Sequence, residues 1–216
     1  MPPQPLRSAL CFLGHIATHA ELLEVHGQES AILPFRINAG ASRRLRTGLY
    51  VCAHLSESEL TAAWCGGHLD CLTVLAELGL PVDDGGELHL RLARGHGRAS
   101  ARRRVDAPLT HAHWSRLRTP IPRLEETLHA ARLGEPLDRL RVPVVEALRQ
   151  AMTTCLSYAA SAEVLRAMVS AGHPADELAR TVASTPRRVQ LALRRIGTTP
   201  PEVRHALERL TPGNLF

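Results

Sequence analysis

The chain has 216 residues, of which 44% are hydrophobic, 3% aromatic and 22% charged, so it can bury a core and does not have the composition of a disordered protein. No apolar run approaches the roughly 18 residues that a membrane-spanning helix needs, and the N-terminus lacks the basic and apolar regions of a signal peptide. The five cysteines include no Cys-x-x-Cys pair, so we expect free thiols in a reducing cytoplasm.

Charge is distributed unevenly along the chain. All 26 basic side chains are arginines, and the net charge is +5. Residues 1–54 carry five arginines against three acids, residues 91–118 eight against one, and residues 187–216 six against two, whereas residues 55–90 carry seven acids and no arginine. Clustered positive charge indicates an anionic partner, most often a nucleic acid. The alternative is that the acidic and basic stretches pair with each other or lie on separate solvated faces.

The first 54 residues predict three short helices followed by a hairpin. Apolar spacing predicts a helix that ends at Gly14 and a second helix that opens with the capping box of Thr18 and Glu21. A third helix is expected over Ser30–Asn38. Two β-prone runs within Ser42–Cys52 flank a Thr-Gly turn and predict the hairpin. This order is that of a winged helix-turn-helix, in which the third helix enters the major groove and the hairpin, or wing, lies against phosphate.

The rest of the chain predicts two strands and then helices. Residues 55–80 are expected to be helical, with two apolar stripes around a Gly-Gly pair and with Ser56 and Ser58 as candidate N-caps. Alternation predicts a strand over Glu87–Leu92 and a weaker one over Leu109–Trp114, joined by a basic, glycine-containing loop. Further helices are expected over residues 122–133, 144–156, 161–171, 174–182, 185–196 and 199–210.

These elements define a mainly α fold with small β parts. We expect a winged helix-turn-helix domain over residues 1–54 and a C-terminal domain over residues 55–216. In the second domain a short strand pair precedes a helical bundle, which would form a subdomain over residues 120–216.

Two stretches resemble a known family. Leu13–Leu23, followed by the arginine-rich hairpin Ser42–Cys52, resembles the N-terminal winged helix of AbiEi-type antitoxins, the DNA-binding and autorepressing halves of type IV toxin–antitoxin systems. Ala62–Leu80 and the strand Leu88–Leu92 resemble the next segment in actinobacterial relatives that end in a Vsr-like (very-short-patch-repair type) endonuclease domain. Arg187–Leu210 is similar to the helical lead-in to that nuclease, but its catalytic strands have no counterpart here. The resemblance implies DNA binding without cleavage.

A winged helix would contact DNA through polar and basic side chains of its third helix and wing. Arginine and asparagine can pair with guanine and adenine edges, and wing arginines suit phosphate. The candidate residues are Gln28, Ser30, Arg36, Asn38, Ser42, Arg43, Arg44, Arg46 and Thr47. The alternative is a winged helix used for protein contacts, with a merely solvated wing.

Two further basic stretches are candidate DNA contacts. The glycine-containing loop suits an arm on phosphate or in a minor groove, unless it is balanced by the acidic stretch before it. Its candidate residues are Arg98, Arg102, Arg103 and Arg104. Asp176–Arg195 has the spacing of a helix-turn-helix, with Ala179 at the helix crossing, although an ordinary helical subdomain is the favoured interpretation. As a helix-turn-helix it would face DNA with Arg187, Arg188, Gln190, Arg194 and Arg195.

The sequence predicts neither a metal site nor an enzyme. His111 and His113 share an expected strand, but a zinc site needs three or four ligands, and we expect these histidines to be incidental. Cys65 and Cys71 are expected to be buried thiols. No phosphate-binding loop, Gly-x-Ser-x-Gly, His-Glu-x-x-His or paired-carboxylate motif is present, and no cofactor is expected.

The sequence therefore predicts a cytoplasmic, sequence-specific DNA-binding repressor, either an antitoxin-type autorepressor or a repressor carried by a phage or mobile element. Its partner would be double-stranded DNA, with a cognate toxin in the antitoxin case and no membrane. A monomer that contacts DNA with both domains is preferred over a dimer, because no heptad seam is present. The alternatives are a Vsr-like endonuclease and a toxin-neutralising protein-interaction module.

Overall fold

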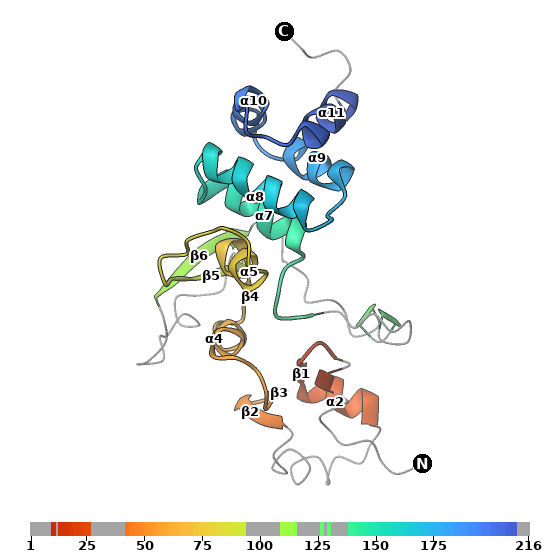
Figure 1. The fold of residues 1–216 in the computed structure, drawn as a ribbon. Helices are drawn as coiled ribbons and strands as arrows, with labels where there is room; N and C mark the ends of the chain where they lie inside the picture. The colour runs from red at the N-terminus through yellow and green to blue at the C-terminus, as the bar shows by residue number, and fades with distance from the viewer. Residues whose placement is uncertain are drawn as a thin grey trace. The chain divides into compact units, whose positions relative to one another are not determined.

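The computed structural model describes residues 10–11, 13–26, 42–93, 109–115, 126–127, 129–130 and 138–210 (Figure 1). The described residues belong to two compact units. Unit 1 draws them from residues 1–69, 90–107 and 112–141, and unit 2 from residues 70–89, 108–111 and 142–216. The chain thus passes between the units several times, whereas the sequence analysis placed one boundary after residue 54.

The first sheet of unit 1 has the strand order β1-β3-β2, all antiparallel. Its elements are β1 (Ile16–Thr18), α2 (His19–His26), β2 (Ser42–Arg46) and β3 (Leu49–Cys52). The expected hairpin is confirmed, and Gly48 occupies the left-handed region at φ +74° in its turn. Strand β1 was not expected: it has only three residues and exists because it pairs with β3, Ile16 opposite Val51.

The capping box that opens α2 is confirmed. The backbone N–H of Glu21 donates to Thr18 Oγ1 at 3.2 Å, and the N–H of Thr18 donates to Glu21 Oε2 at 2.6 Å. Two backbone donors at the helix start are thereby satisfied by side chains. The expected third helix, Ser30–Asn38, lies outside the described residues.

A second sheet has the strand order β4-β5-β6. The elements around it are α4 (Glu57–Cys65), β4 (His68–Leu69), β5 (Leu88–Ala93) and β6 (Thr110–Ser115). The expectation of helix throughout residues 55–80 was wrong at β4. Gly66 ends α4 at φ +67°, and Gly67 then lies so close to β5 that a Cβ there would stand 2.8 Å from the carbonyl oxygen of Arg91. Of the two candidate N-caps, Ser56 caps α4, and Ser58 lies within the helix.

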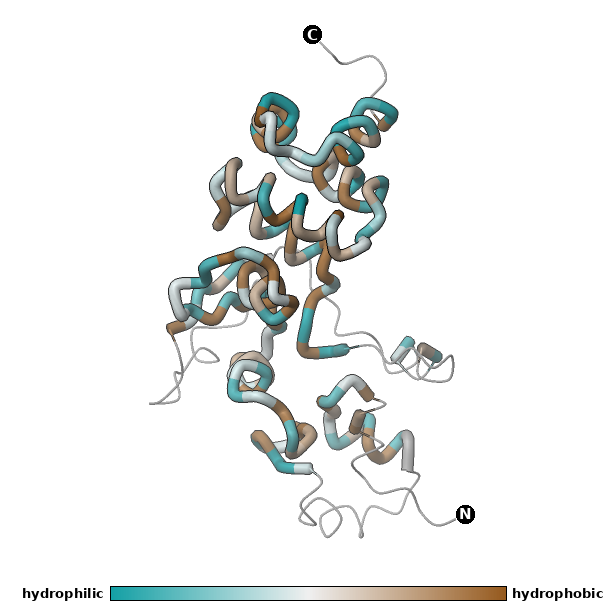
Figure 2. The backbone as a smooth tube through the Cα atoms, viewed as in Figure 1, coloured by the Kyte–Doolittle hydropathy of each residue, from teal (hydrophilic) through white to brown (hydrophobic). Residues whose placement is uncertain are grey.

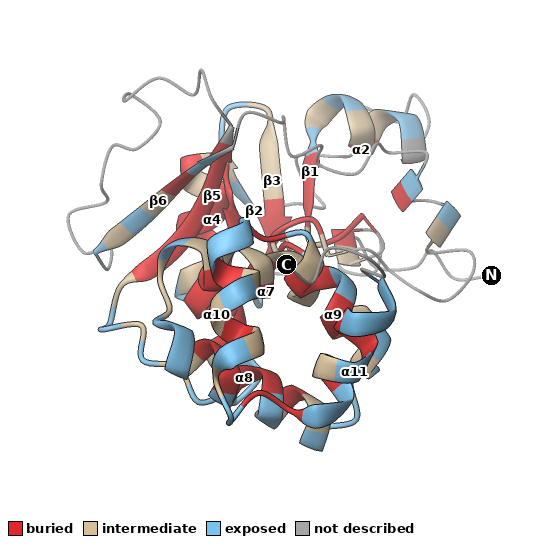
Figure 3. Cartoon of the chain, turned by 90° about the horizontal axis from the view of Figure 1, so that it is seen from above, coloured by how far each residue is buried: buried red, intermediate tan, exposed pale blue. Residues whose placement is uncertain are grey.

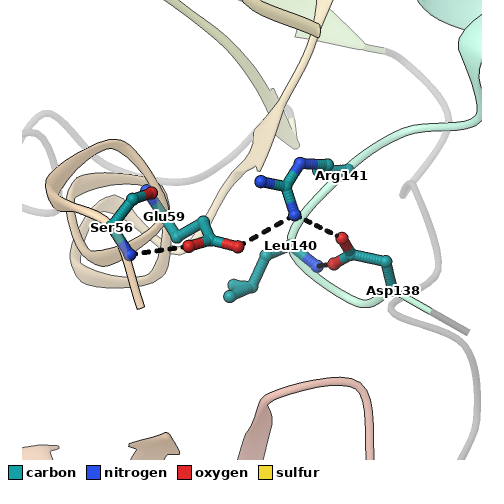
Figure 4. Close-up of polar contacts among 5 residues, drawn as sticks. All are labelled: Ser56, Glu59, Asp138, Leu140 and Arg141. Carbon is teal, nitrogen blue, oxygen red and sulfur yellow. Dashed lines mark hydrogen bonds and ion pairs between the residues drawn. The ribbon is translucent and has the colours of Figure 1, made fainter. Parts of the chain in front are cut away.

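Residues 138–141 fasten the parts of unit 1 to one another. The Leu69 N–H donates to the Leu140 carbonyl at 2.7 Å. Arg141 Nη1 bridges the carboxylates of Glu59, at 2.8 Å, and Asp138, at 2.7 Å, and the other Asp138 oxygen accepts from the Leu140 N–H (Figure 4). Residues 138–141 are thereby bound to α4 and β4.

Arg139 binds the same segment to the N-terminal elements. Its side chain is only 5% exposed. Nη1 donates to the Ile16 carbonyl at 3.1 Å, and Nη2 donates to Glu21 Oε1 at 2.7 Å. The Glu21 carboxylate therefore serves both the capping box of α2 and this buried ion pair. Leu140 itself joins the apolar core of unit 1, beside Leu13, Leu22 and others.

Unit 2 is helical. Its helices are α5 (Cys71–Glu77), α7 (Val144–Thr154), α8 (Tyr158–Ser170), α9 (Ala175–Ala183), α10 (Arg187–Arg195) and α11 (Pro201–Leu210). Figure 3 shows their buried faces, which share one apolar core that includes Leu148, Met152, Leu165 and Leu178. The helices expected between residues 144 and 210 are confirmed, with ends shifted by up to three residues, while most of the one over residues 122–133 lies outside the described residues.

The mainly α composition with small β parts is confirmed for the described residues. None of the helices described is long and apolar enough to cross a membrane.

Replacing Arg139 with alanine should destabilise unit 1, because the Glu21 carboxylate and the Ile16 carbonyl lose their buried donor. Removing one partner of a buried ion pair costs about 3–5 kcal/mol. Both tryptophans, Trp64 and Trp114, belong to unit 1, so tryptophan fluorescence during urea denaturation measures this loss. The control Arg43→Ala removes an exposed arginine of the same unit and should cost less than about 1 kcal/mol. An equal effect of both substitutions would contradict the assignment.

Unit 1 should also lose stability in acid. Burial would raise the pKa of Glu21, but hydrogen bonds from Arg139 and Thr18 outweigh it and hold that pKa below its ordinary value of 4.5. Because the pKa is lower in the folded state, the ionised carboxylate stabilises the fold above pH 4.5, and this contribution disappears as the pH falls through the folded-state pKa. Urea denaturation at neutral pH and at successive values below 4.5 measures it. Glu21→Gln should be less stable at neutral pH and show a weaker acid dependence; an unchanged dependence refutes the assignment.

Candidate nucleic-acid interface

The arginines of the expected wing lie exposed on β2. Arg43, Arg44 and Arg46 are all exposed, and so is Thr47 in the turn that follows. Strand β2 is an edge of its sheet, and its register against β3 shifts between Arg44 and Arg46. Such a bulge twists an edge strand and redirects its side chains. The result is three guanidinium groups presented by one short edge strand.

Ser42 does not belong to this exposed set. Its side chain is buried, and it stands opposite Cys52 in the β2–β3 ladder. The expectation that Ser42 faces a ligand is therefore corrected: the register of the hairpin turns this residue toward the core of unit 1.

Helices α9 and α10 are joined by a tight, internally bonded turn. Only residues 184–186 separate the two helices. Ser184 Oγ donates to the Thr181 carbonyl at 2.7 Å, and Thr185 Oγ1 donates to the Val182 carbonyl at 2.6 Å. The apolar face that joins the helices is fully buried and includes Leu178, Ala179, Val182, Val189 and Leu193. The spacing noted in the sequence thus corresponds to a real helix pair.

The outer surface of α10 is basic. Arg187, Arg188 and Arg195 are exposed, and no acidic residue occurs in the nine residues of this helix. Figure 2 shows both hydrophilic and hydrophobic residues along it. Arg187 and Arg188 occupy the first turn, where the helix dipole already favours negative charge. Two cations at this end therefore strengthen the attraction for an anion such as phosphate.

Gln190 and Arg194 are less available than expected. Gln190 Nε2 donates to two carbonyls of the turn, that of Ala183 at 2.9 Å and that of Thr185 at 2.7 Å. The expectation that Gln190 contacts a ligand is corrected, because its amide group bridges the turn between α9 and α10. Arg194 is half-buried.

The remaining candidate contacts lie outside the described residues. They are Gln28, Ser30, Arg36, Asn38, Arg98, Arg102, Arg103 and Arg104.

Among the cysteines and histidines singled out in the sequence, Cys65, Cys71 and His113 are buried, whereas His111 is exposed. Cys65 and Cys71 are buried as expected, and burial raises the pKa of the Cys65 thiol, which makes it a poor nucleophile. His111 is exposed, and its ring stacks on that of His89 with centroids 4.8 Å apart. Its Nδ1 lies 3.6 Å from a carboxylate oxygen of Glu87.

Sequence reasoning missed a group of possible metal ligands in unit 1. Its members are Cys11, His15, Cys52 and His54. Their ligand atoms lie within 4.8 Å of one another in unit 1. Burial lowers the pKa of His15 from its ordinary value of 6.5, so its imidazole is neutral at neutral pH. The signal was present as Cys-x-x-x-His followed by Cys-x-His, but it was overlooked because neither half contains Cys-x-x-Cys.

Comparison with known proteins adds no assignment: no family model matches the chain, and no curated protein does.

Replacing Gln190 with alanine should destabilise unit 2, because two buried or half-buried carbonyls of the turn lose their donor. The expected cost is about 1–3 kcal/mol in the free energy of unfolding, measured by far-UV circular dichroism in urea. The control Gln150→Ala removes an amide that donates to exposed Thr154 and should cost much less. If Gln190→Ala leaves stability unchanged and instead alters binding to a ligand, the bridging role assigned to Gln190 is wrong.

Proposed function

We propose that this protein is a DNA-binding transcriptional repressor and that α10 is its recognition helix. The observation that carries the proposal is the α9–α10 pair: one face of α10 is buried through Val189 and Leu193, while the other presents Arg187, Arg188 and Arg195 to solvent. The second helix of a helix-turn-helix enters the major groove with its N-terminal residues on the base edges. Arginine pairs there with the O6 and N7 atoms of guanine.

The β2–β3 hairpin supports a second contact with DNA. A helix between β1 and β2 and the strand order β1-β3-β2 agree with the order expected of a winged helix. Arg43, Arg44 and Arg46 would act as wing residues that neutralise phosphates. The resemblance of this segment to AbiEi-type antitoxins points to the same role.

Such a protein would repress transcription in the cytoplasm by occupying an operator. Most of the affinity would come from phosphate neutralisation by the arginines, and the choice of sequence from α10 and from any helix that precedes the wing. The operator would belong either to the protein's own operon, as in a toxin–antitoxin pair, or to genes of a mobile element. No feature of the described residues favours the nuclease alternative.

Replacing both Arg187 and Arg188 with alanine should weaken specific binding by on the order of 1–3 kcal/mol for each arginine that pairs with a base. An operator is first selected from random duplexes, and affinities are then measured by fluorescence anisotropy over a series of salt concentrations. The triple variant Arg43→Ala, Arg44→Ala and Arg46→Ala should weaken binding to all duplexes and reduce the salt slope by about 0.9 for each phosphate that is no longer neutralised.

A matched control removes two exposed arginines elsewhere in unit 2. Arg166 donates to the Thr198 carbonyl, and Arg209 pairs with Asp176. The Arg166→Ala and Arg209→Ala double variant has the same net charge as the α10 variant. A similar loss of DNA affinity in both variants would mean that overall charge, and not the position of the arginines on α10, causes the loss. Absence of duplex binding at low salt, or cleavage of the duplex with divalent metal, would refute the proposal.

A further inference from the structure

Two cysteines and two histidines of unit 1 come together from two distant segments. Cys11 and His15 flank the end of a helical turn, and Cys52 and His54 lie at and just beyond the end of β3. One ligand atom from each lies within 4.8 Å of the other three. The two Sγ atoms are 3.7 Å apart, and the two imidazole rings meet edge to face with centroids 5.3 Å apart.

The backbone places these donors through a Schellman motif. The His15 N–H donates to the Leu10 carbonyl at 2.7 Å, and the Gly14 N–H donates to the Cys11 carbonyl at 3.2 Å. Gly14 and His15 both have φ +71°, an arrangement that glycine adopts readily and histidine rarely. The Cys52 N–H then donates to the His15 carbonyl at 3.0 Å and joins β3 to the turn. The fold thus holds His15 in an unfavourable conformation directly beside the two thiols.

We propose that Cys11, His15, Cys52 and His54 bind a structural Zn²⁺ ion. Two sulfurs at about 2.3 Å from a tetrahedral zinc stand about 3.8 Å apart, which agrees with the 3.7 Å observed. A disulfide would need about 2.05 Å, so these thiols are not bonded to each other. Two thiolates with two imidazoles form a donor set that is typical of tetrahedral zinc.

His15 supplies an independent indication of a ligand. Its Nδ1 atom is buried, and among the described residues it has no hydrogen-bond partner. A buried polar atom of this kind is costly unless something binds it. His54, by contrast, is exposed, and this leaves a path by which the ion can enter.

The ion would join the helical turn at Cys11 to the end of the wing strand β3. Cys11 and Cys52 are 41 residues apart in the chain, so a bond through zinc closes a long loop. Metal binding would then contribute to the folding of unit 1, whether or not that unit binds DNA.

A second group of sulfur and imidazole donors includes Cys71, His89 and Cys155 of unit 2, and the test must separate it from the first. Cys155 Sγ lies 3.8 Å from His89 Nδ1. A hydrogen bond with Cys155 raises the pKa of the Cys71 thiol. Metal content alone therefore does not identify the site, and substitutions in unit 1 are needed.

The test measures zinc in the full chain purified under reducing conditions from zinc-supplemented cells, by mass spectrometry of the metal. Cys11→Ser and His54→Ala should each lower the zinc content by about one ion per chain relative to wild type. Circular dichroism checks that each variant is folded. If Cys11→Ser fails to fold, His54→Ala still tests the proposal, because it changes an exposed residue. The control Cys65→Ser removes a buried thiol outside the group and should retain all the zinc.

Two further readouts connect the ion to these ligands. Cobalt(II) substituted for zinc should give the strong visible bands of a tetrahedral site with thiolate charge transfer, and Cys11→Ser should weaken them. A zinc chelator should lower the urea midpoint detected by tryptophan fluorescence in wild type but not in Cys11→Ser. The proposal is overturned if wild type holds no zinc, if both variants keep its full content, or if peptide mapping finds a Cys11–Cys52 disulfide in the reduced preparation.

Discussion

A buried guanidinium sets the strictest requirement in unit 1. Arg139 is removed from water, and a buried charge is tolerated only where an opposite charge and acceptors surround it. Glu21 and the Ile16 carbonyl provide these for two of its three nitrogens, from positions 118 and 123 residues away. The same carboxylate caps α2, so the start of that helix, strand β1 and the late segment around Arg139 depend on one another. Displacing any one of them leaves a buried polar group without its partner.

The features that sequence predicts well are those decided within a few residues. The capping box of Thr18 with Glu21 and the N-cap at Ser56 are both formed, because each depends only on partners three residues apart. The helices between residues 144 and 210 follow from apolar periodicity. Strands β1 and β4 were missed because three and two residues carry no period, and their partners alone make them strands.

The candidate sites also differ in whether nearby residues or distant partners decide them. The basic surface of α10 follows from composition and helical spacing, whereas the bridging role of Gln190 depends on where the turn directs two carbonyl oxygens. Ser42 was expected at the surface because charge was considered without strand register. The proximity of Cys11 and Cys52 was not predicted, because it arises from the pairing of β1 with β3 and no local sequence pattern indicates that pairing.

The first turn of α10 has a consequence for the evolution and engineering of this chain. Arg187 and Arg188 stand at the end of a helix that favours acidic residues, so each costs the free protein about 0.3–1 kcal/mol. Substitutions to aspartate or glutamate would relieve this repulsion and make the isolated chain more stable. Selection for thermal stability alone would therefore remove the guanidinium groups, and a thermostabilised version would have a lower affinity for anions. The proposed DNA binding by α10 gives a reason for their presence in this unfavourable position.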